Sequence, residues 1–385
     1  MKSKNVLVVI NLLGSAKNFV GNQFKYLSEH GYNMHLVCSP HPELKEFAMR
    51  QGISYEAIQL NRQFTPWQDF KSLWKLCKYI KKHNIDTVIG HQVKGRLLAT
   101  LASFIVRVPN VIIFAHGAVF ETAKGVKKSL LIAESKLESL LSDKIICVSN
   151  YIKELRLQNK IDAPEKQFLL GLGTCGGIDT KNLFNPDLVE PAIKNTLQEK
   201  YELSNCDFVI GFVGRLVRDK GVVELIDAFN IVKEQNPDKS IKLLIIGNPE
   251  TRNRLPEATL EIIKSTRDIV YTGHVPHENM PALYLCMDCL VLPSYREGFG
   301  MCNIEAQAMG IPVLTSFSTG SRDSIVNELT GFYVKIDSND IAARINHLLN
   351  SGKILDIGNA GKKWVRTNFD HYVIWPHLVK LLESF

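Results

Sequence analysis

The sequence lacks the features that mark disordered, secreted or membrane-spanning proteins. No disordered tail or low-complexity segment stands out in its 385 residues. The longest apolar region, "LLATLASFIVRVPNVIIFA", is divided by Arg107 and Pro109, so it cannot cross a bilayer as one helix. The apolar run near the N-terminus breaks at Asn11 and lacks a small-residue cleavage site, so we expect a buried strand there. These absences predict a protein that is soluble or peripheral to a membrane.

Charge and cysteine are also modest. The net charge of +7 is small for this length and does not indicate a nucleic-acid partner, although it permits attraction to phosphates or to an anionic membrane. Eight irregularly spaced cysteines, several inside apolar runs, are typical of reduced thiols in a cytosolic protein. Cys286 and Cys289 form a CxxC pair, but no second CxxC or Cys/His cluster completes a zinc site, so packing is favoured over a metal or redox motif.

Length and strand pattern predict two α/β domains. A chain of 385 residues with 45% hydrophobic content is too long for one ordinary core. Short apolar segments such as "NVLVVINL", "DTVIGHQ" and "NVIIFAHG" alternate with helix-like ones such as "NFVGNQFKYLSEHG" and "DFKSLWKLCKYIKKHN". Near residue 185 the chain becomes polar and turn-rich, and a second series begins with "FVIGFVGRL". The pattern predicts two doubly wound parallel sheets facing across a cleft at the carboxyl ends of their strands.

One motif is expected to be misleading. Residues 171–176, "GLGTCG", match the GxGxxG fingerprint of dinucleotide-binding proteins. That fingerprint needs a helix directly after it and an acidic residue about 20 residues on. The following "GIDTKNLFNP" is turn-forming and ends at Pro186, so a glycine-rich crossover loop is favoured over a nicotinamide site.

The second half holds a more informative group of charges. Strand-like "FVIGFVG" is followed by Arg215 and Lys220, and then by Gly221 and a helix. Two cations beside a helix N-terminus suit a diphosphate, although solvated surface charges are the alternative.

The stretch "SYREGFGMCNIEAQAMG" adds a second half-site. It predicts a turn followed by a helix over residues 301–309, which Gly310 and Pro312 end. A helix N-terminus suits a phosphate, and Glu305 on the first turn could accept hydrogen bonds from ribose hydroxyls. Glu297 in the turn would face whatever lies beyond the phosphates; two solvated glutamates are the alternative.

These motifs resemble family 4 of the retaining glycosyltransferases, which have the GT-B fold. The resemblance rests on Glu297-Gly-Phe-Gly…Glu305 with "FVGRLVRDKG" upstream, and on "YTGHV" and "GSRDSIVNELTGFYV" in family order. The first half is most similar to bacterial polysaccharide-assembly members, with Val93 in "GHQVKGRLLA" where proline is usual. The resemblance implies two Rossmann-like domains: residues 1–187 for the acceptor, joined by a C-terminal helix over 366–385 that crosses back, and residues 188–365 for the donor.

The resemblance also implies roles for matching residues. Arg215 and Lys220 would clamp the donor diphosphate, Glu305 the ribose, and Glu297 the transferred hexose. His116 would reach the donor sugar from across the cleft, although a lone histidine is more often structural. The implied catalytic residues are Glu297, His116, Lys220 and Arg215, and the implied donor-binding residues are Gly14, Gly214, Arg215, Lys220, His274, Val275, Glu297, Gly298, Phe299, Gly300, Met301 and Glu305. Among these, His274 and Val275 would contact the base, and Gly14 would let the first loop approach the donor unless it only forms a tight turn.

The implied activity is transfer of a hexose or N-acetylhexosamine from a nucleoside-diphosphate sugar, with a UDP-sugar favoured. The acceptor would be a polyprenyl-diphosphate-linked or other glycan in capsule or O-antigen synthesis. We expect no cofactor and no metal, because no DxD-like acidic pair ends a strand. A front-side retaining route, in which the leaving phosphate helps to deprotonate the acceptor, is the default. A sugar-nucleotide epimerase of the same fold and a non-catalytic nucleotide-sugar sensor are the alternatives.

The acceptor is expected on the first domain. "WQDFKSLWKLCKYIKKHN" combines Trp67 and Trp74 with five lysines, which suits contact with the cytoplasmic face of a membrane. An ordinary amphipathic helix with a solvated lysine face is the alternative. We therefore expect a cytoplasmic protein with peripheral membrane contact.

Overall fold

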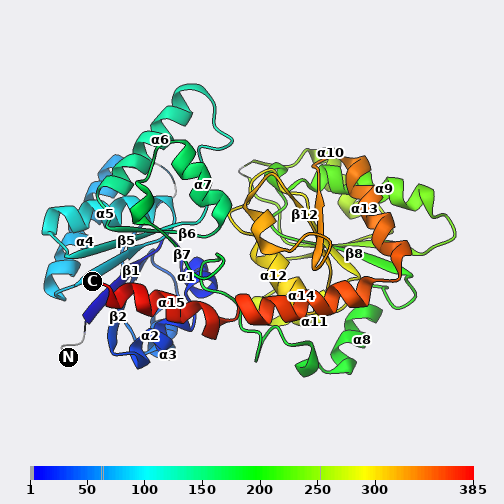
Figure 1. Cartoon of the computed structure of the whole chain (residues 1–385), viewed down its shortest axis with the longest axis horizontal. Coiled ribbons are helices and arrows are strands. Elements are labelled where there is room, and N and C mark those ends of the chain that lie inside the picture. Colours follow the sequence, from blue (N-terminus) through cyan, green and yellow to red (C-terminus); the bar gives the residue numbers. More distant parts are fainter. Residues whose placement is uncertain (1–3, 62, 64, 252) are drawn as a thin grey trace. The chain divides into compact units, whose positions relative to one another are not determined.

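The chain folds into two compact α/β units. A computed structural model describes residues 4–61, 63, 65–251 and 253–385. Unit 1 comprises Met1–Gly177 and His371–Phe385, and unit 2 comprises Ile178–Asp370 (Figure 1). The sequence predicts divisions after residues 187 and 365, whereas the chain divides after Gly177 and Asp370. The predicted α/β class is confirmed, because each unit is a parallel sheet with helices packed around it.

Unit 1 is built on a seven-stranded parallel sheet in the order β3-β2-β1-β4-β5-β6-β7. The apolar runs found in the sequence become strands because their side chains are buried in the core. The strand order reverses between β1 and β4, where ligands of such sheets bind beyond the carboxyl ends. The strands are β1 (Lys4–Val9), β2 (Tyr32–Cys38), β3 (Ser54–Ala57), β4 (Thr87–Gly90), β5 (Asn110–Ala115), β6 (Lys144–Cys147) and β7 (Gln167–Leu169).

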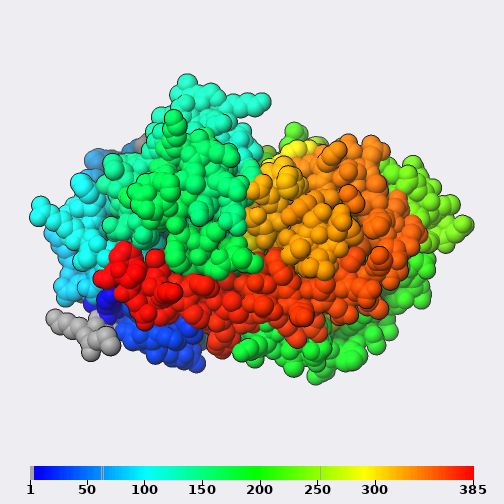
Figure 2. Space-filling view, viewed as in Figure 1, coloured from blue at the N-terminus to red at the C-terminus, as the bar shows by residue number. Residues whose placement is uncertain are grey.

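The helices of unit 1 are α1 (Leu13–Phe19), α2 (Gln23–Glu29), α3 (Leu44–Gln51), α4 (Pro66–Lys82), α5 (Val93–Val106), α6 (Gly125–Leu140), α7 (Asn150–Gln158) and α15 (His371–Glu383). "NFVGNQFKYLSEHG" predicts one helix, but the structure has two, because Gly21 adopts a φ of +48° between them. Helix α6 stands out from the surface of unit 1 in Figure 2. The C-terminal helix α15 returns to unit 1, as expected, and Trp375 Nε1 donates to the carbonyl oxygen of Gly176 at 2.8 Å.

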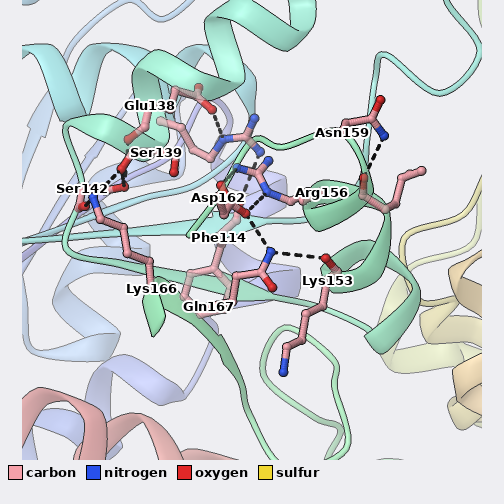
Figure 3. A network of polar contacts seen from close by, with 12 residues as sticks. Phe114, Glu138, Ser139, Ser142, Lys153, Arg156, Asn159, Asp162, Lys166 and Gln167 are labelled. Atoms are coloured by element: carbon pink, nitrogen blue, oxygen red, sulfur yellow. Dashed lines mark hydrogen bonds and ion pairs between the residues drawn. The ribbon is translucent and has the colours of Figure 1, made fainter. Parts of the chain in front are cut away.

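A buried ionic network ties α5, α6, α7 and β7 together in unit 1 (Figure 3). The Arg156 side chain, 1% exposed, donates to both carboxylate oxygens of Asp162 at 2.6 and 2.8 Å, and Gln167 donates to Asp162 at 2.9 Å. Arg96 donates to Glu138 at 3.0 Å. Burial alone would raise the pKa of Asp162, but the Arg156 guanidinium outweighs it and holds that pKa below its ordinary value.

Unit 2 has a six-stranded parallel sheet in the order β10-β9-β8-β11-β12-β13. The order reverses between β8 and β11, which makes the carboxyl ends of these two strands the switch point of the unit. The strands are β8 (Phe208–Val213), β9 (Ile241–Ile246), β10 (Ile269–Gly273), β11 (Cys289–Leu292), β12 (Val313–Ser316) and β13 (Gly331–Val334). The helices are α8 (Pro191–Lys200), α9 (Val222–Gln235), α10 (Glu257–Ser265), α11 (Met280–Tyr284), α12 (Met301–Ala308), α13 (Ser338–Ser351) and α14 (Ile354–Asn368).

Two segments of unit 2 can be compared with the sequence. The segment after residue 185, polar and turn-rich in the sequence, contains helix α8, which Pro191 begins because proline is well tolerated at the first helical position. Cys286 and Cys289 are both buried between α11 and β11, in agreement with packing rather than metal binding. Within the described parts of the chain, no helix has the length and apolar character needed to cross a membrane.

Candidate active site

Lys220 and Glu297 meet at the switch point of unit 2, whereas the side chains of Arg215 and Glu305 have other partners. Gly214 and Arg215 directly follow β8, and the turn over residues 293–300 follows β11. The carboxyl ends of β8 and β11 are neighbours because these strands pair in parallel. Residues that lie some 80 positions apart in the sequence thus reach the same edge of the sheet.

Gly221 allows the segment before α9 to pack against the end of β11. It adopts a φ of +66°, and a Cβ there would lie 2.1 Å from the carbonyl oxygen of Pro293. Two further contacts fasten the segments together: Tyr295 N donates to Asp219 O at 2.8 Å, and Arg296 pairs with Asp219 at 2.9 Å. The backbone that carries Lys220 is therefore held directly beside the turn that carries Glu297.

Lys220 and Glu297 form an ion pair. Their side chains are only 13% and 19% exposed. The resemblance assigns Lys220 to the donor diphosphate and Glu297 to the sugar, and here each neutralises the other. A diphosphate carries more negative charge than one carboxylate, so it would compete with Glu297 for the Lys220 side chain.

Arg215 reaches toward solvent instead of into the turn. Its side chain is 55% exposed, and its Nη1 donates to Glu250 Oε2 at 2.9 Å. An exposed ion pair of this kind contributes little to stability, so Arg215 can change partner at small cost. Glu250 had no motif that would have marked it in the sequence.

Helix α12 begins as predicted. Gly300 is its N-cap, with a φ of +85°, and as a glycine it makes no side-chain cap. Gly320 lies so near that a Cβ on it would be 2.0 Å from the carbonyl oxygen of Gly298, and Gly320 N donates to Glu297 O at 2.9 Å. Phe299 is buried against Phe369. The turn is thus fixed by backbone crowding, with the positive end of the α12 dipole beside it.

Glu305 is buried on α12, and both its carboxylate oxygens already have partners. Tyr284 OH donates to Oε2 at 2.8 Å, and His277 Nε2 lies 3.1 Å from Oε1. The hydrogen bond to Glu305 raises the pKa of His277, whereas burial and then the Glu305 charge raise the pKa of Tyr284. Each carboxylate oxygen keeps a second lone pair, so Glu305 can still accept from a ligand hydroxyl.

His274 and Val275 follow β10 and line a pocket of about 540 Å³. His274 is exposed and Val275 half-buried. The opposite wall is apolar and comes from α8 and the residues before it, including Leu188 and Leu197. The pocket holds neither Glu305 nor Lys220 in its lining.

The predicted residues of the first half lie in unit 1. His116 follows β5, and its Nε2 is 3.0 Å from Nδ1 of His91, which follows β4. Phe19 stacks on the His116 ring at 4.6 Å, and burial, His91 and Arg96 together hold the pKa of His116 well below its ordinary value. Both imidazoles are therefore neutral at pH 7. Gly14 is exposed in α1, and a Cβ there would meet open space.

Comparisons with known proteins identify the family. Residues 193–364 match the model of the glycosyl transferases group 1, and residues 9–149 match that of the glycosyl transferase 4-like proteins. The capsular polysaccharide biosynthesis glycosyltransferase CapM of Staphylococcus aureus is 33% identical over 388 residues, which cover 100% of this chain and 98% of CapM. The chain belongs to the group 1 glycosyltransferases.

Further relatives agree with this. The UDP-Gal:alpha-D-GlcNAc-diphosphoundecaprenol alpha-1,3-galactosyltransferase of Escherichia coli is 27% identical, over 90% of this glycosyltransferase and 87% of its own length. The crystal structure of Anabaena HepE with UDP and glucose superposes with a TM-score of 0.80 at 18% identity, covering 100% of both chains. WaaG, a glycosyltransferase of lipopolysaccharide biosynthesis, superposes with a TM-score of 0.74 at 14% identity, over 98% of this chain and 99% of WaaG. The predicted GT-B fold is confirmed.

Some residues of this glycosyltransferase escaped sequence reasoning. Tyr284 and His277 contact Glu305 from the short segment between β10 and β11. No sequence motif links a tyrosine or a histidine to a glutamate more than 20 residues away, so these contacts could not be predicted. The motif "YTGHV" ends two residues before His277, which was the available signal. Asp219 was hidden in the same way, because its partner Arg296 is distant in sequence.

Proposed function

We propose that this glycosyltransferase moves a hexose or N-acetylhexosamine from a UDP-sugar to a polyprenyl-diphosphate-linked glycan, with retention of configuration, during assembly of a bacterial surface polysaccharide. The observation that carries the proposal is the meeting of Lys220, Glu297 and the N-terminus of α12 at one switch point, with Glu305 on the second turn of that helix and not on the first turn as expected. CapM and the E. coli galactosyltransferase support the acceptor class, and HepE with UDP and glucose supports the donor.

The chain's own charges supply the chemistry. Lys220 leaves Glu297 for the donor diphosphate, and Arg215 leaves Glu250 for the same group, so the negative charge that develops on the leaving group is neutralised. Glu297 is then free to accept hydrogen bonds from the transferred sugar. Glu305 accepts from the ribose hydroxyls.

The remaining predicted contacts complete the donor site. His274 and Val275 contact the base, the backbone of residues 298–301 assists the phosphates, and His116 and Gly14 approach the sugar. The leaving phosphate accepts the proton of the acceptor hydroxyl as the glycosidic bond forms. We expect no metal or cofactor to take part in the transfer, so turnover needs no added metal and EDTA does not lower it.

A panel of nucleotide sugars tests the activity. Released nucleoside diphosphate is measured with and without a polyprenyl-diphosphate-linked acceptor, and the anomeric configuration of the product is read by NMR. Acceptor-dependent release with a retained anomer is expected. Release of a free sugar without an acceptor would identify an epimerase, and donor binding without release a sensor.

Substitutions test the site. Lys220→Ala and Glu305→Ala are each expected to lower turnover by roughly 100-fold or more, because a preorganised charge at the leaving group or donor is lost. Lys264→Ala, on the exposed face of α10, is the control with unchanged turnover. A melting temperature close to that of the wild type shows that the fold is intact, and unchanged turnover in Lys220→Ala would refute the assignment.

We also propose that α4 binds the cytoplasmic face of an anionic membrane, where a lipid-linked acceptor resides. Its buried face consists of Ser72, Leu76, Tyr79 and Ile80, and its other face carries exposed lysines. Trp67, Phe70 and Trp74 are also exposed, by 79%, 62% and 55%. Three large exposed aromatic side chains beside the lysines are typical of a membrane-binding surface and are not expected on a helix face that only contacts water.

Vesicle flotation tests this membrane contact. Binding to vesicles rich in phosphatidylglycerol, but not to phosphatidylcholine alone, is expected. Each lysine near an anionic surface contributes about 1 kcal/mol, so reversing three charges should weaken binding by roughly 100-fold or more. The variant carries Lys71→Glu, Lys75→Glu and Lys78→Glu, and the matched control carries Lys335→Glu, Lys353→Glu and Lys363→Glu in unit 2. Equal loss in both variants would show a nonspecific charge effect.

A further inference from the structure

The glycine-rich loop over residues 171–177 brings a cysteine to the two histidines of unit 1. One ring nitrogen from each of His91 and His116 and the Sγ atom of Cys175 all lie within 4.8 Å of one another. No other group of three or more histidine, cysteine or acidic residues in the described structure is arranged in this way. The loop that contains the GxGxxG match therefore places Cys175 beside His91 and His116.

The three side chains are held in place by the surrounding fold. The His91 ring stacks on Phe114 at 4.4 Å, and the His116 ring stacks on Phe19 at 4.6 Å. Cys175 Sγ lies 3.6 Å from the carbonyl oxygen of Phe19. The three groups are therefore arranged before any ligand arrives.

The backbone next to two of these residues is strained. Gln92, which follows His91, has a φ of +59°, and Thr174, which precedes Cys175, has a φ of +85°. Residues other than glycine rarely adopt such angles, and a β-branched threonine least of all. Strain of this kind persists only where the surrounding structure enforces it, and it is concentrated at functional sites.

We propose that His91, His116 and Cys175 bind a soft divalent metal ion such as Zn²⁺, and that the bound ion inhibits glycosyl transfer. The inhibition rests on the proposed function, in which His116 contacts the donor sugar, whereas metal binding stands without it. Imidazole nitrogen and thiolate sulfur are both ligands that Zn²⁺ takes in proteins, and three protein ligands leave a fourth position open.

The spacing of the three groups is close to what this ion needs. With Zn–N bonds of about 2.0 Å and Zn–S bonds of about 2.3 Å, a tetrahedral site needs N···N of about 3.3 Å and N···S of about 3.5 Å, and Cys175 Sγ lies within 4.8 Å of a ring nitrogen of each histidine. Nδ1 of His91 is 3.0 Å from Nε2 of His116, so the rings need to separate by only a few tenths of an ångström. His91 and Cys175 are buried and His116 is half-buried, which leaves His116 as the side from which an ion enters.

Protonation and local charge are compatible with the ion. Burial lowers the pKa of His91 to about 3, so its ring is in the neutral form that ligates metals. Burial raises the pKa of Cys175, and the metal has to displace the thiol proton, as in other thiolate sites. The nearest cation, Arg96, is paired with Glu138 at 3.0 Å and does not confront the ion with an unbalanced charge.

Competition with a chromophoric zinc chelator tests the proposal on the full-length protein. The wild type is expected to withdraw one equivalent of Zn²⁺ from the chelator. Cys175→Ser and His91→Gln should weaken the affinity by about 100-fold or more, because loss of even an outer-shell partner costs 10- to 100-fold. Cys286→Ser is the control that keeps wild-type affinity, since its thiol is buried in unit 2.

Cobalt substitution provides a readout that needs no variant. Co²⁺ bound to the wild type should show a thiolate-to-cobalt charge-transfer band and the intense visible bands of tetrahedral coordination. Absence of zinc withdrawal, an octahedral cobalt spectrum without the thiolate band, or loss of binding in Cys286→Ser in place of Cys175→Ser would each overturn the site. Zinc binding without inhibition of transfer would retain the site and refute only the role of His116 in donor contact.

Discussion

The hydroxyl of Tyr284 should set how well Glu305 binds the donor. Tyr284→Phe removes only the hydroxyl that donates to Glu305 Oε2 at 2.8 Å, and it keeps the buried ring and its edge contact with Phe184. A hydrogen bond to a charged group contributes about 1.5–3 kcal/mol, so we expect unfolding to become easier by about 2 kcal/mol. If about 1.4 kcal/mol of this is also lost from the donor complex, the donor KM rises about tenfold. We expect kcat to change little, because in the proposed function Glu305 binds the ribose and not the transferred sugar.

Initial rates of UDP release and urea unfolding measure the two effects. Tyr333→Phe is the matched control, because its hydroxyl donates to the neutral carbonyl of Arg322 at 3.1 Å on another edge of unit 2. The control should lose about 1 kcal/mol of stability and keep its donor KM. A lower stability with an unchanged KM in Tyr284→Phe would show that Tyr284 only supports the fold. Unchanged stability would refute the hydrogen bond itself.

Other predictions concern stability and its dependence on pH. Asp162→Asn leaves Arg156 buried without its counter-charge, so urea should unfold the variant at a free energy about 3–5 kcal/mol lower; an equal midpoint would contradict the buried pair. The pKa of Asp162 is lowered in the folded protein, so its ionised form stabilises the fold above the unfolded pKa of about 3.9. This stabilisation is lost as the pH falls through the folded value. Acid titration followed by circular dichroism should therefore show the stabilities of the wild type and Asp162→Asn converging. The pKa of His277 is raised, so its contribution is present below its unfolded pKa of about 6.5 and is lost as the pH rises through the folded value; the difference in melting temperature between wild type and His277→Gln should be larger at pH 5.5 than at pH 8.5.

The periodic parts of the fold could be predicted from the sequence. Buried parallel strands are continuous apolar runs, so "FVIGFV" and "CLVL" were recognisable at once, and Gly310 marked the end of α12. The break between α1 and α2 could not be predicted in the same way, because it depends on the positive φ of Gly21. Nor did the polar composition around Pro191 reveal α8, because this helix buries none of its residues and so leaves no apolar face to find in the sequence.

The candidate site divides along a similar line. Lys220 and Glu297 could be found because each lies between a strand and the helix that follows it, and Glu305 because it lies inside that predicted helix, which are local patterns. Their partners were not, since the contacts of Tyr284 with Glu305 and of Glu250 with Arg215 link residues 21 and 35 positions apart. The sequence alone identifies residues at the end of a strand or the start of a helix. It does not identify residues whose role depends on contacts between elements that are distant in the sequence.

The joining of the two loops through Asp219 has a consequence for changing donor preference. Because Lys220 and Glu297 sit on segments that share backbone and side-chain contacts, and because Gly221 and Gly320 leave no room for a Cβ, neither loop can be reshaped alone. Random substitution in this region should yield mostly inactive variants and few with a new donor. On the proposed function, libraries aimed at new nucleotides are better placed at His274 and Val275, because the pocket that they line has free volume and neither Lys220 nor Glu305 lines it.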